Sequence, residues 1–589
     1  MASKASPANA PDRRPSPVSW EALREEARER FDVHGFRPGQ PELMMAALTG
    51  RDAVGIMPTG GGKSLCYQLP ALFLSGATVV VSPLLALMQD QQEKLAESNI
   101  DAAKLDSTLS AADERAVTHE IRHGEHELIY VTPERLQQPE YLDLLRARQV
   151  SLFVVDEAHC ISQWGHDFRP AYLFLGEALQ HLGRPPVLAL TATSTPEVTA
   201  DIIRQLGLQD PLVINTGIER PNLFFEVFRT VNRVAKRTRL EELIRNEDGS
   251  GIIYTATVRT ANELWEWLRE IEPTAGRYHA KLKQREREET QARFMSGEHR
   301  IIVATKAFGM GIDKPDIRFV VHYQFPDSPE SYYQEAGRAG RDGQPARSVL
   351  LYKLEDRRIQ SYFLGGKYPR REESLKLYEA LQELSEQPGR KGGVALAELA
   401  EIADLGARRA QVIVAQLIAA GIVERRHGRL SLVRDFKDPA EFEQFLGAYE
   451  ARHRGDRERL ESIMRYAETT MCRLRYLRQY FGEETSEDCD HCDNCLHPPA
   501  LAASPPRPPR PRRDTPVGSR PARPRRQGPP PPQPGQMVHH RRFGDGQVVA
   551  VEGQTVTVDF VRARTRRVRA SYLEPLQHQA PAAPQLHAE

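Results

Sequence analysis

The sequence reads Asp156-Glu-Ala-His-Cys-Ile-Ser-Gln-Trp-Gly-His-Asp-Phe-Arg-Pro170 in the stretch that decides its fold. Before it stands Val150-Ser-Leu-Phe-Val-Val155, an apolar run of strand length that is typical of a buried parallel strand. Such a strand brings Asp156 and Glu157 to the carboxyl edge of a sheet. There we expect Asp156 to hold a magnesium ion, usually through water, and Glu157 to orient and deprotonate an attacking water.

Residues 162–169, named the aromatic loop here, follow this acidic pair directly. Trp164, His166 and Phe168 are interleaved with Asp167 and Arg169. Aromatic rings next to cations suit the stacking of nucleobases and contact with phosphates. We therefore expect Trp164, His166, Phe168 and Arg169 to bind nucleic acid and to report it to the acidic pair. A buried aromatic cluster beside a chance acidic pair is the alternative.

A glycine turn at residues 54–64, Val-Gly-Ile-Met-Pro-Thr-Gly-Gly-Gly-Lys-Ser, is typical of a phosphate-binding loop. Backbone N–H groups approach phosphate oxygens there, the lysine supplies a charge for the β- and γ-phosphates, and the serine supplies a hydroxyl for magnesium. A helix that starts near Lys63 adds the positive end of its dipole. The strict pattern has glycine at the position of Met57. The residues expected at the phosphates are Thr59, Gly60, Gly61, Gly62, Lys63 and Ser64.

The segment Gly35-Phe-Arg-Pro-Gly-Gln40 has the groups that recognise adenine. A glutamine amide reads the edge of adenine in two places, and the plane of an arginine stacks on the ring. We expect Arg37 and Gln40 in these roles. The alternative is a helix N-terminus punctuated by proline and glycine.

Strand and helix patterns alternate from here to about residue 350, with strands expected at 78–82, 128–131, 187–190, 251–254 and 301–304. This alternation indicates mostly parallel sheets with ligands at the strand ends. A second α/β block starts near Arg220. In it, Arg338 and Arg341 are three residues apart, so on a helix they share a face and reach a γ-phosphate held by the first block. An arginine of this kind contributes about a thousandfold or more in rate. A solvated basic helix is the alternative.

Composition limits the possible classes. The 589 residues are enough for several domains, and the formal net charge is zero, so any affinity for nucleic acid comes from local patches. No apolar run approaches the length of a membrane span, and no signal-peptide core is present. Four of the six cysteines gather within residues 472–495, which is metal spacing and indicates a reducing compartment.

Together these motifs resemble the RecQ family of superfamily 2 DNA helicases over roughly residues 20–365 and again at 465–497. The residues that carry the resemblance are Phe36–Gln40, Thr59–Ser64, Asp156–Pro170, Thr191-Ala-Thr193, Ala307-Phe-Gly-Met-Gly-Ile-Asp313 and Gln334–Gly343. The resemblance implies two RecA-like lobes with ATP in the cleft and 3′-to-5′ unwinding of DNA. By position it places Arg37 and Gln40 at adenine. It places Lys63, Ser64, Asp156, Glu157 and Asp313 at the Mg-triphosphate, with Arg338 and Arg341 reaching it from the second lobe.

Three positions depart from the family pattern. Val33 stands where the family often has an aromatic that stacks on adenine, which predicts weaker stacking. Thr255 follows Tyr254 in place of a cysteine, and Lys281 replaces a glycine. None of the three removes a catalytic group.

Residues 372–435 fall outside the helicase pattern. Helices expected at 372–386, 396–403 and 407–419, followed by a hairpin around His427-Gly428, indicate a winged helix with arginines available for phosphates. In many family members a winged helix follows the zinc module, whereas this candidate precedes it. A role in packing alone is the alternative.

Cys472, Cys489, Cys492 and Cys495 fit a tetrahedral structural zinc site without an open position. The resemblance extends to the 17-residue spacing of the first two cysteines. His491 is a possible competing ligand, and a catalytic zinc is the less favoured reading. The residues after this module form a Pro/Arg-rich spacer, with eight arginines and one aspartate between Arg507 and Arg526.

Residues 537–576 contain short strands with glycine-rich turns. They resemble the Tudor-like C-terminal barrel of UvrD-type helicases, a module associated with RNA polymerase. A barrel that simply binds nucleic acid is the alternative. We see no helical HRDC domain of the kind that some family members carry.

The sequence therefore predicts an α/β protein with two RecA-like parallel-sheet lobes, a winged-helix-like domain, a zinc-binding helical module and a small SH3/Tudor-like β-barrel. The expected segments are a disordered tail (1–18), lobe 1 (19–217), lobe 2 (218–366), the winged-helix-like domain (367–438), the zinc module (439–497), a linker (498–536), the barrel (537–577) and a tail (578–589).

We expect an ATP-dependent DNA helicase of DNA repair, recombination and replication that uses ATP, Mg²⁺ and structural Zn²⁺. It would act in the cytoplasm on single-stranded and on tailed or branched DNA, with RNA polymerase as a further partner and no membrane. An RNA helicase or transcription-coupled translocase, and a non-enzymatic zinc and winged-helix scaffold, remain as alternatives.

Overall fold

A computed structural model of the chain describes residues 18–106, 108–162, 164–165, 167–309, 312, 314–367, 371–386, 393–426, 429–498, 532–540, 544–552, 555–560 and 564–575. Two of the predicted site residues, His166 and Asp313, lie outside this part of the chain, as do the expected hairpin turn His427-Gly428, most of the expected linker and most of both tails. The chain divides into two units, residues 1–501 and 502–589, which are treated separately below.

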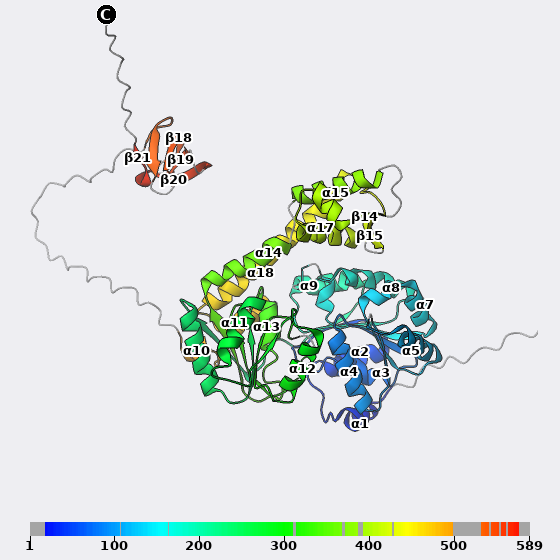
Figure 1. Ribbon diagram of the computed structural model, residues 1–589. Coiled ribbons are helices and arrows are strands. Elements are labelled where there is room, and N and C mark those ends of the chain that lie inside the picture. Colours follow the sequence, from blue (N-terminus) through cyan, green and yellow to red (C-terminus); the bar gives the residue numbers. More distant parts are fainter. Residues whose placement is uncertain are drawn as a thin grey trace, which may run out of the picture. The chain divides into compact units, whose positions relative to one another are not determined.

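The first lobe, blue to cyan in Figure 1, is built on a seven-stranded sheet. The strand order is β3-β4-β2-β5-β6-β1-β7, and neighbouring strands are parallel. Its strands are fully or largely apolar, as expected for strands that are covered on both faces. They are β1 (Ala53–Ile56), β2 (Ala77–Val81), β3 (Ala102–Leu105), β4 (Leu128–Val131), β5 (Val150–Val155), β6 (Val187–Thr191) and β7 (Leu212–Asn215).

Helices cover both faces of this sheet, because successive strand residues point to opposite sides. In β5, Phe153 and Val155 join the core under α5, α7, α8 and α9, whereas Leu152 and Val154 join the core under α2, α3 and α4. The helices are α1 (Trp20–Phe31), α2 (Gln40–Thr49), α3 (Leu65–Ala71), α4 (Leu85–Glu97), α5 (Ala111–His123), α6 (Pro133–Leu136), α7 (Pro139–Ala147), α8 (Leu175–His181) and α9 (Pro196–Leu206).

The second lobe repeats this design with a six-stranded parallel sheet of order β10-β11-β9-β12-β13-β8. Its strands are β8 (Leu223–Arg229), β9 (Ser250–Tyr254), β10 (Gly276–Tyr278), β11 (Ile301–Ala304), β12 (Ile317–His322) and β13 (Ala346–Tyr352). Its helices are α10 (Arg233–Asn246), α11 (Val258–Leu268), α12 (Gln284–Met295), α13 (Pro329–Ala336) and α14 (Arg357–Lys367). The two parallel-sheet lobes are those predicted from the sequence.

A separate small domain follows the second lobe, with its own apolar core. It contains α15 (Arg371–Glu386), α16 (Leu396–Ile402) and α17 (Ala407–Ala419). An antiparallel sheet accompanies them, in the order β14 (Val394–Ala395), β16 (Arg429–Leu432) and β15 (Val423–Arg426). Three helices and a small antiparallel sheet match the winged-helix-like arrangement predicted for this region. We call it the inserted domain.

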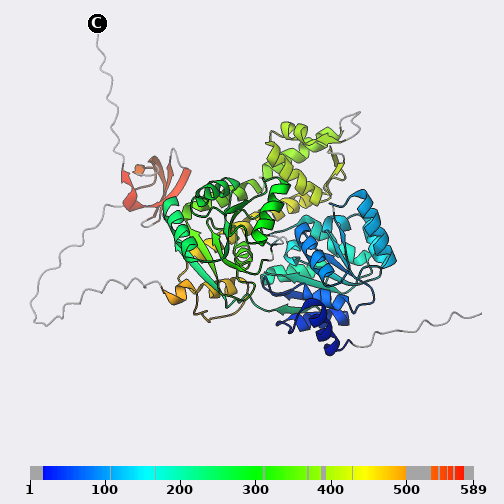
Figure 2. The same ribbon diagram turned by 60° about the horizontal axis from the view of Figure 1, so that its bottom comes forward.

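The zinc region consists of α18 (Pro439–Glu468), α19 (Arg473–Tyr480) and α20 (Asp493–Leu496). The start of α18 packs Phe442 and Phe445 on the core of the inserted domain. Its other end places Leu460 and Ile463 in the core of the second lobe, which also contains Cys472 and residues of α19. Figure 2 shows the yellow-to-orange zinc region against the green second lobe. The zinc region and the second lobe thus share one apolar core.

The second unit contains a five-stranded antiparallel sheet of order β20-β19-β18-β17-β21. Its strands are β17 (Met537–His540), β18 (Gly544–Glu552), β19 (Thr555–Phe560), β20 (Arg564–Arg569) and β21 (Glu574–Pro575). Across the described residues of both units, no helix is both long enough and apolar enough to cross a membrane.

Candidate functional site

The glycine turn after β1 holds Lys63 in a buried position. Gly60 and Gly62 have φ values of 78° and 77°, a left-handed conformation that glycine adopts without steric cost. The Lys63 ammonium donates to the carbonyl oxygen of Met57 at 3.3 Å. The Met57 side chain is buried in the core, which explains why a residue other than glycine fits there. Burial lowers the pKa of Lys63, and the nearby acidic pair opposes this effect.

The acidic pair stands at the carboxyl end of β5, as the strand pattern predicted. The Asp156 carboxylate accepts a hydrogen bond from the Glu157 N–H at 2.9 Å, and Glu157 has the unusual backbone angles φ 46° and ψ 47°. A left-handed conformation at a residue other than glycine is strained and is often found at functional sites. Burial and the neighbouring Glu157 raise the pKa of Asp156 to about 7, although Lys63 counteracts them.

This donor set fits a magnesium ion. Two partly buried carboxylates next to each other disfavour their charged forms unless a cation is present. Within the described part of the chain, Glu157 Oε2 is buried without a hydrogen-bond partner and lies 3.3 Å from His159 Nδ1. The Ser64 hydroxyl lines the same cavity and adds the kind of oxygen ligand that magnesium prefers.

His159 links the acidic pair to the end of β6. Its Nδ1 lies 2.9 Å from Thr191 Oγ1, and that hydroxyl donates to the carbonyl of Thr193 at 3.1 Å. No role was expected for His159 or for Thr191–Thr193 from the sequence, although both belong to the motifs quoted there. In the sequence, His159 comes four residues after the buried strand β5 and Thr191 ends β6, so both lie at the same edge of the sheet.

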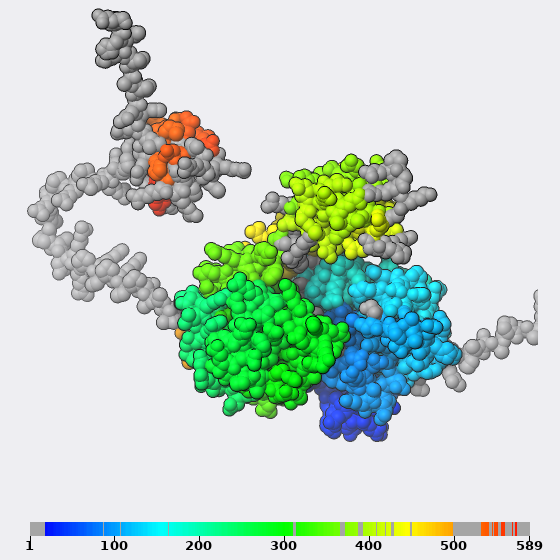
Figure 3. Space-filling view, viewed as in Figure 1, coloured from blue at the N-terminus to red at the C-terminus, as the bar shows by residue number. Residues whose placement is uncertain are grey.

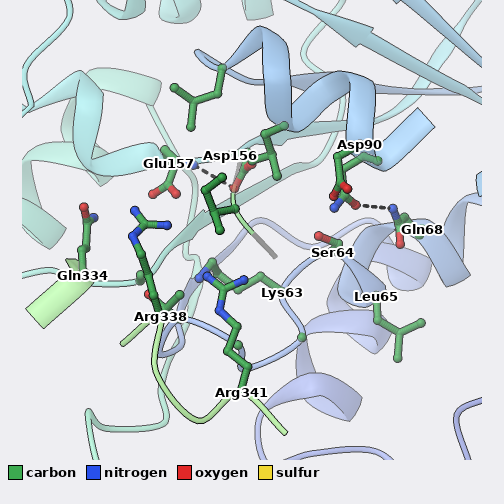
Figure 4. A pocket seen from close by; sticks show the side chains of 18 of the residues that line it. Lys63, Ser64, Leu65, Gln68, Asp90, Asp156, Glu157, Gln334, Arg338 and Arg341 are labelled. Atoms are coloured by element: carbon green, nitrogen blue, oxygen red, sulfur yellow. Dashed lines mark hydrogen bonds between the residues drawn. The ribbon is translucent and has the colours of Figure 1, made fainter. Parts of the chain in front are cut away.

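A cavity of about 540 Å³ lies between the two lobes at this edge. Figure 4 shows Arg338 and Arg341 of the second lobe reaching toward Lys63 and the acidic pair. In the space-filling view of Figure 3, green atoms of the second lobe lie directly against blue atoms of the first. The predicted site residues that line the cavity are Arg37, Gln40, Thr59, Gly60, Gly62, Lys63, Ser64, Asp156, Glu157, Arg338 and Arg341.

The expectation that Arg338 and Arg341 share a helix face is wrong. Helix α13 ends at Ala336, and both arginines lie in the turn that follows. Gly340 has a φ of 60°, so the chain leaves the helical path between the two arginines. The turn nevertheless brings both side chains to the cavity, with Arg338 packed over Gly309 and Arg341 over Gly60 of the glycine turn.

Arg37 and Gln40 connect the expected base site to the glycine turn. The Gln40 side chain accepts from the Arg37 N–H at 2.8 Å and donates to the Gly62 carbonyl at 2.9 Å. Arg37 donates to the carbonyl of Gly60. Phe31 and Val33 line the same cavity, so an aromatic ring is present near the place where Val33 replaces the family's usual one.

Arg220 joins the two lobes, a role that was not predicted from the sequence. Its guanidinium donates to the carbonyl of Thr59 in the glycine turn at 3.0 Å and to those of Ala339 and Gly340 at 3.1 and 2.7 Å. Burial lowers the pKa of Arg220. One cation therefore holds the glycine turn and the Arg338–Arg341 turn together. In the sequence Arg220 marked only the start of the second block.

The aromatic loop is anchored but leaves one ring open. Ser162 donates to the buried Asp201 carboxylate at 2.7 Å, and Arg169 donates to the carbonyl of Pro83 at 2.9 Å. A side chain at Gly165 would come within 2.5 Å of the His159 carbonyl oxygen, so glycine permits the tight return of the loop. Trp164 is 41% exposed, which is inconsistent with a buried aromatic cluster at this residue.

The four cysteines gather from the start of α19, where Cys472 is the N-cap, and from the segment Cys489–Cys495 that leads into α20. Their sulfur atoms all lie within 4.8 Å of one another, with distances of 3.4 and 4.0 Å between Cys492 and its neighbours Cys495 and Cys472. A tetrahedron with Zn–S bonds of about 2.3 Å has edges of about 3.8 Å. The His491 ring contacts the backbone carbonyl of Cys489, outside this cluster. The cysteines alone therefore fill a structural zinc shell.

Removing the zinc is expected to destabilise the second lobe as well as the zinc region, because Cys472 and Cys492 belong to the core that contains Tyr332 and Leu350. Structural zinc contributes about 10 kcal/mol to local folding. The variant Cys492→Ser should lose stoichiometric zinc and show a lower unfolding temperature in calorimetry. Cys66→Ser, a buried cysteine of the first lobe, is the control for zinc content. Full zinc retention by Cys492→Ser would contradict the assignment.

Comparison with family models gives three matches along the chain. The DEAD/DEAH box helicase model matches residues 37–202, and the helicase conserved C-terminal domain model matches residues 235–343. The RecQ zinc-binding model matches residues 435–496. The inserted domain thus falls between the last two matches.

Curated relatives and a solved structure agree with these matches. The ATP-dependent DNA helicase RecQ of Bacillus subtilis is 45% identical over 337 residues, which are 57% of this chain and 56% of the relative. The crystal structure of the DUF1998 helicase MrfA bound to DNA covers 72% of this chain and 63% of its own, with a TM-score of 0.50 and 17% identity, and shows a likeness of fold alone.

A further relative decides the family. The probable ATP-dependent DNA helicase RecS of Bacillus subtilis is 40% identical over 363 residues, which are 61% of this chain and 73% of that relative. This chain spans about half the length of other RecQ relatives. With the RecQ zinc-binding match, the complete set of motifs and the two parallel-sheet lobes, this chain belongs to the RecQ family of superfamily 2 helicases.

Proposed function

We propose that this protein is an ATP-dependent DNA helicase that moves 3′ to 5′ and acts in the cytoplasm in DNA repair, recombination and replication. The observation that carries the proposal is the continuity of the acidic pair with the aromatic loop. Glu157 and the exposed Trp164 are joined by one short segment that packs at the edge of the first sheet. A group that activates water is thus connected to a surface on which a base stacks.

The residues at the cavity divide the chemistry among them. Lys63 and the backbone of the glycine turn bind the phosphates of ATP, and Ser64 and Asp156 hold magnesium. Magnesium, when bound, neutralises charge on the β- and γ-phosphates. Glu157 orients the attacking water and accepts its proton. Arg338 and Arg341 stabilise the charge that develops on the γ-phosphate.

Single-stranded DNA at the aromatic loop favours closure of the two lobes. Closure sets Arg338 and Arg341 against the γ-phosphate and places Glu157 at the water. Hydrolysis removes the group that both lobes contact, so the cleft reopens. Repeated closing and opening moves the lobes along the strand, as expected when a ligand binds one of two states more tightly.

Lys63→Ala and Glu157→Gln are expected to lower ATP hydrolysis at least a hundredfold, because one loses the phosphate cation and the other the base. Glu157→Gln should still bind ATP, whereas Lys63→Ala should bind it weakly. Steady-state hydrolysis and equilibrium binding of a fluorescent ATP analogue distinguish the two. Glu263→Gln is the control, because Glu263 is a partly exposed residue of α11 that does not line the cavity. Hydrolysis at the wild-type rate in both site variants would exclude this function.

Trp164→Ala is expected to uncouple hydrolysis from DNA. Stacking of one base on an aromatic side chain contributes about 1–3 kcal/mol, so stimulation by single-stranded DNA should fall severalfold or more. The measurement is the ratio of hydrolysis rates with and without oligonucleotide. Tyr362→Ala removes an exposed aromatic of α14 outside the loop and should keep the wild-type ratio. An unchanged ratio in Trp164→Ala would refute the role of the loop.

Arg220→Ala is expected to lower the rate constant for hydrolysis tenfold to a hundredfold with little change in ATP affinity. The substitution removes the bonds that hold the glycine turn against the arginine turn, and small misplacements of catalytic groups cost rates of this order. Pre-steady-state hydrolysis and ATP-analogue binding would separate the two effects. Arg259→Ala, an exposed arginine of α11, serves as the control. A change in affinity alone would contradict the positioning role.

The choice between DNA and RNA rests on the family and is tested directly. Hydrolysis should be stimulated by single-stranded DNA and much less by RNA of the same sequence. Stronger stimulation by RNA would favour the RNA helicase or transcription-coupled translocase. No hydrolysis under any condition would favour a scaffold built from the zinc region and the inserted domain.

We also infer that the C-terminal sheet is a Tudor-like partner module that contacts RNA polymerase. Support comes from its five antiparallel strands around a small apolar core of Val538, Val548, Val556, Val558 and Leu573. A chain that ends at residue 498 should keep DNA-stimulated hydrolysis and lose co-purification with RNA polymerase. This inference would be overturned if the shortened chain still co-purified with RNA polymerase. If only the full chain bound duplex DNA, the sheet would instead be a nucleic-acid-binding module.

A further inference from the structure

Helix α18 of the zinc region reaches across to the aromatic loop of the first lobe. The Arg459 guanidinium donates to the main-chain carbonyl of Trp164 at 2.7 Å. About two turns earlier on the same helix, the Arg452 guanidinium lies 5.4 Å from the centre of the Phe168 ring. Two arginines of one helix thus contact two residues of the loop that we expect to bind DNA.

Acidic groups fix Arg459 in this position. It pairs with Asp456, three residues earlier, and both side chains are largely buried. Glu330 of α13 lies near them, is buried, and accepts a hydrogen bond from the Tyr480 hydroxyl at 2.8 Å. Burial opposes the charged form of Arg459, but Asp456 and Glu330 outweigh it and raise the pKa of Arg459. A cation paired with a buried carboxylate has little freedom to move.

The bond from Arg459 goes to the backbone of the loop and leaves its ring free for other contacts. The Trp164 N–H is held by the Ser162 hydroxyl at 3.2 Å, and the carbonyl is held by Arg459. With both sides of this residue fixed, the indole remains 41% exposed. A base can therefore stack on the ring without breaking either bond.

The other anchors of the loop described above, Ser162 on Asp201 and Arg169 on Pro83, stay within the first lobe. Arg459 differs because its helix shares the core of the second lobe and the zinc region. Movement of the second lobe relative to the first is thus transmitted to the loop that carries Trp164. The zinc region stabilises the second lobe and also contacts the aromatic loop.

We propose that Arg459 is a positioning residue for DNA-stimulated ATP hydrolysis, which holds the backbone of Trp164 so that its ring is preset for stacking on a base. The proposal rests on the proposed function, since it concerns how DNA stimulates hydrolysis. Arg459 touches neither the nucleotide cavity nor the reacting atoms, and it acts through Trp164.

The test compares Arg459→Ala and Arg459→Lys with Arg457→Ala, which removes an exposed arginine from the same helix. The readout is the concentration of single-stranded oligonucleotide that gives half-maximal stimulation, together with the maximal stimulated rate. Loss of one charge-assisted hydrogen bond at a preset loop should raise that concentration about tenfold in Arg459→Ala. Arg459→Lys should fall between Arg459→Ala and wild type, because lysine keeps the charge and one donor. Arg457→Ala should stay within about twofold of wild type.

A double-mutant cycle with Trp164→Ala separates positioning from a general effect on the fold. If Arg459 acts by presenting the indole, Arg459→Ala should add little to the defect of Trp164→Ala. The proposal would be overturned if the defects of the two single variants multiplied in the double variant. It would also be overturned if Arg459→Ala needed the same oligonucleotide concentration as the wild type for half-maximal stimulation. Asp456→Asn, which weakens the hold on Arg459, should shift the requirement in the same direction even if Arg459→Ala fails to fold.

Zinc content and unfolding temperature are measured for every variant, so that a folding defect is recognised. The wild-type protein is measured first. Absence of DNA stimulation in the wild type would overturn the proposed function itself. If DNA stimulates the wild type, and Arg459→Ala with full zinc content shows the same stimulation at the same oligonucleotide concentration, only the role of Arg459 is overturned.

Discussion

The structure depends on a small group of buried charges at the end of one strand. Lys63 faces Asp156 and Glu157 across the glycine turn, and burial shifts the pKa of Lys63 down and that of Asp156 up to about 7. Each group is costly to bury alone, and together they form a site that a magnesium nucleotide completes. These charges are held in place by the two parallel sheets, by the strained backbone of Glu157 and by the Arg338–Arg341 turn.

Local patterns were enough to predict most of this arrangement. An apolar run followed by an acidic pair identifies β5, a glycine turn identifies the phosphate loop, and four spaced cysteines identify the zinc site. The prediction of a helix around Arg338 and Arg341 was wrong because α13 ends before Gly337 and Gly340 takes a left-handed conformation. Arg220 and Arg459 were missed for another reason, since their partners lie 161 and 295 residues away in the sequence. Pairings at such distances follow from tertiary structure and leave no periodic signal.

Helix α18 connects the inserted domain to the second lobe and the zinc region. One end of the helix belongs to the core of that domain, the other to the core shared by the second lobe and the zinc region, and Arg459 contacts the aromatic loop between them. The position of the inserted domain before the zinc region thus places it on the same helix that contacts the aromatic loop. A helix with apolar anchors at both ends transmits displacement because its backbone is held by its own hydrogen bonds.

The most direct test of the account is strand separation on two duplexes that differ only in the polarity of the single-stranded tail. The account predicts ATP-dependent unwinding of the 3′-tailed duplex, little unwinding of the 5′-tailed one, and none with Lys63→Ala. DNA-stimulated hydrolysis without separation of either duplex, or a preference for the 5′ tail, would contradict the claim that the acidic pair and the aromatic loop form the motor of a 3′-to-5′ DNA helicase.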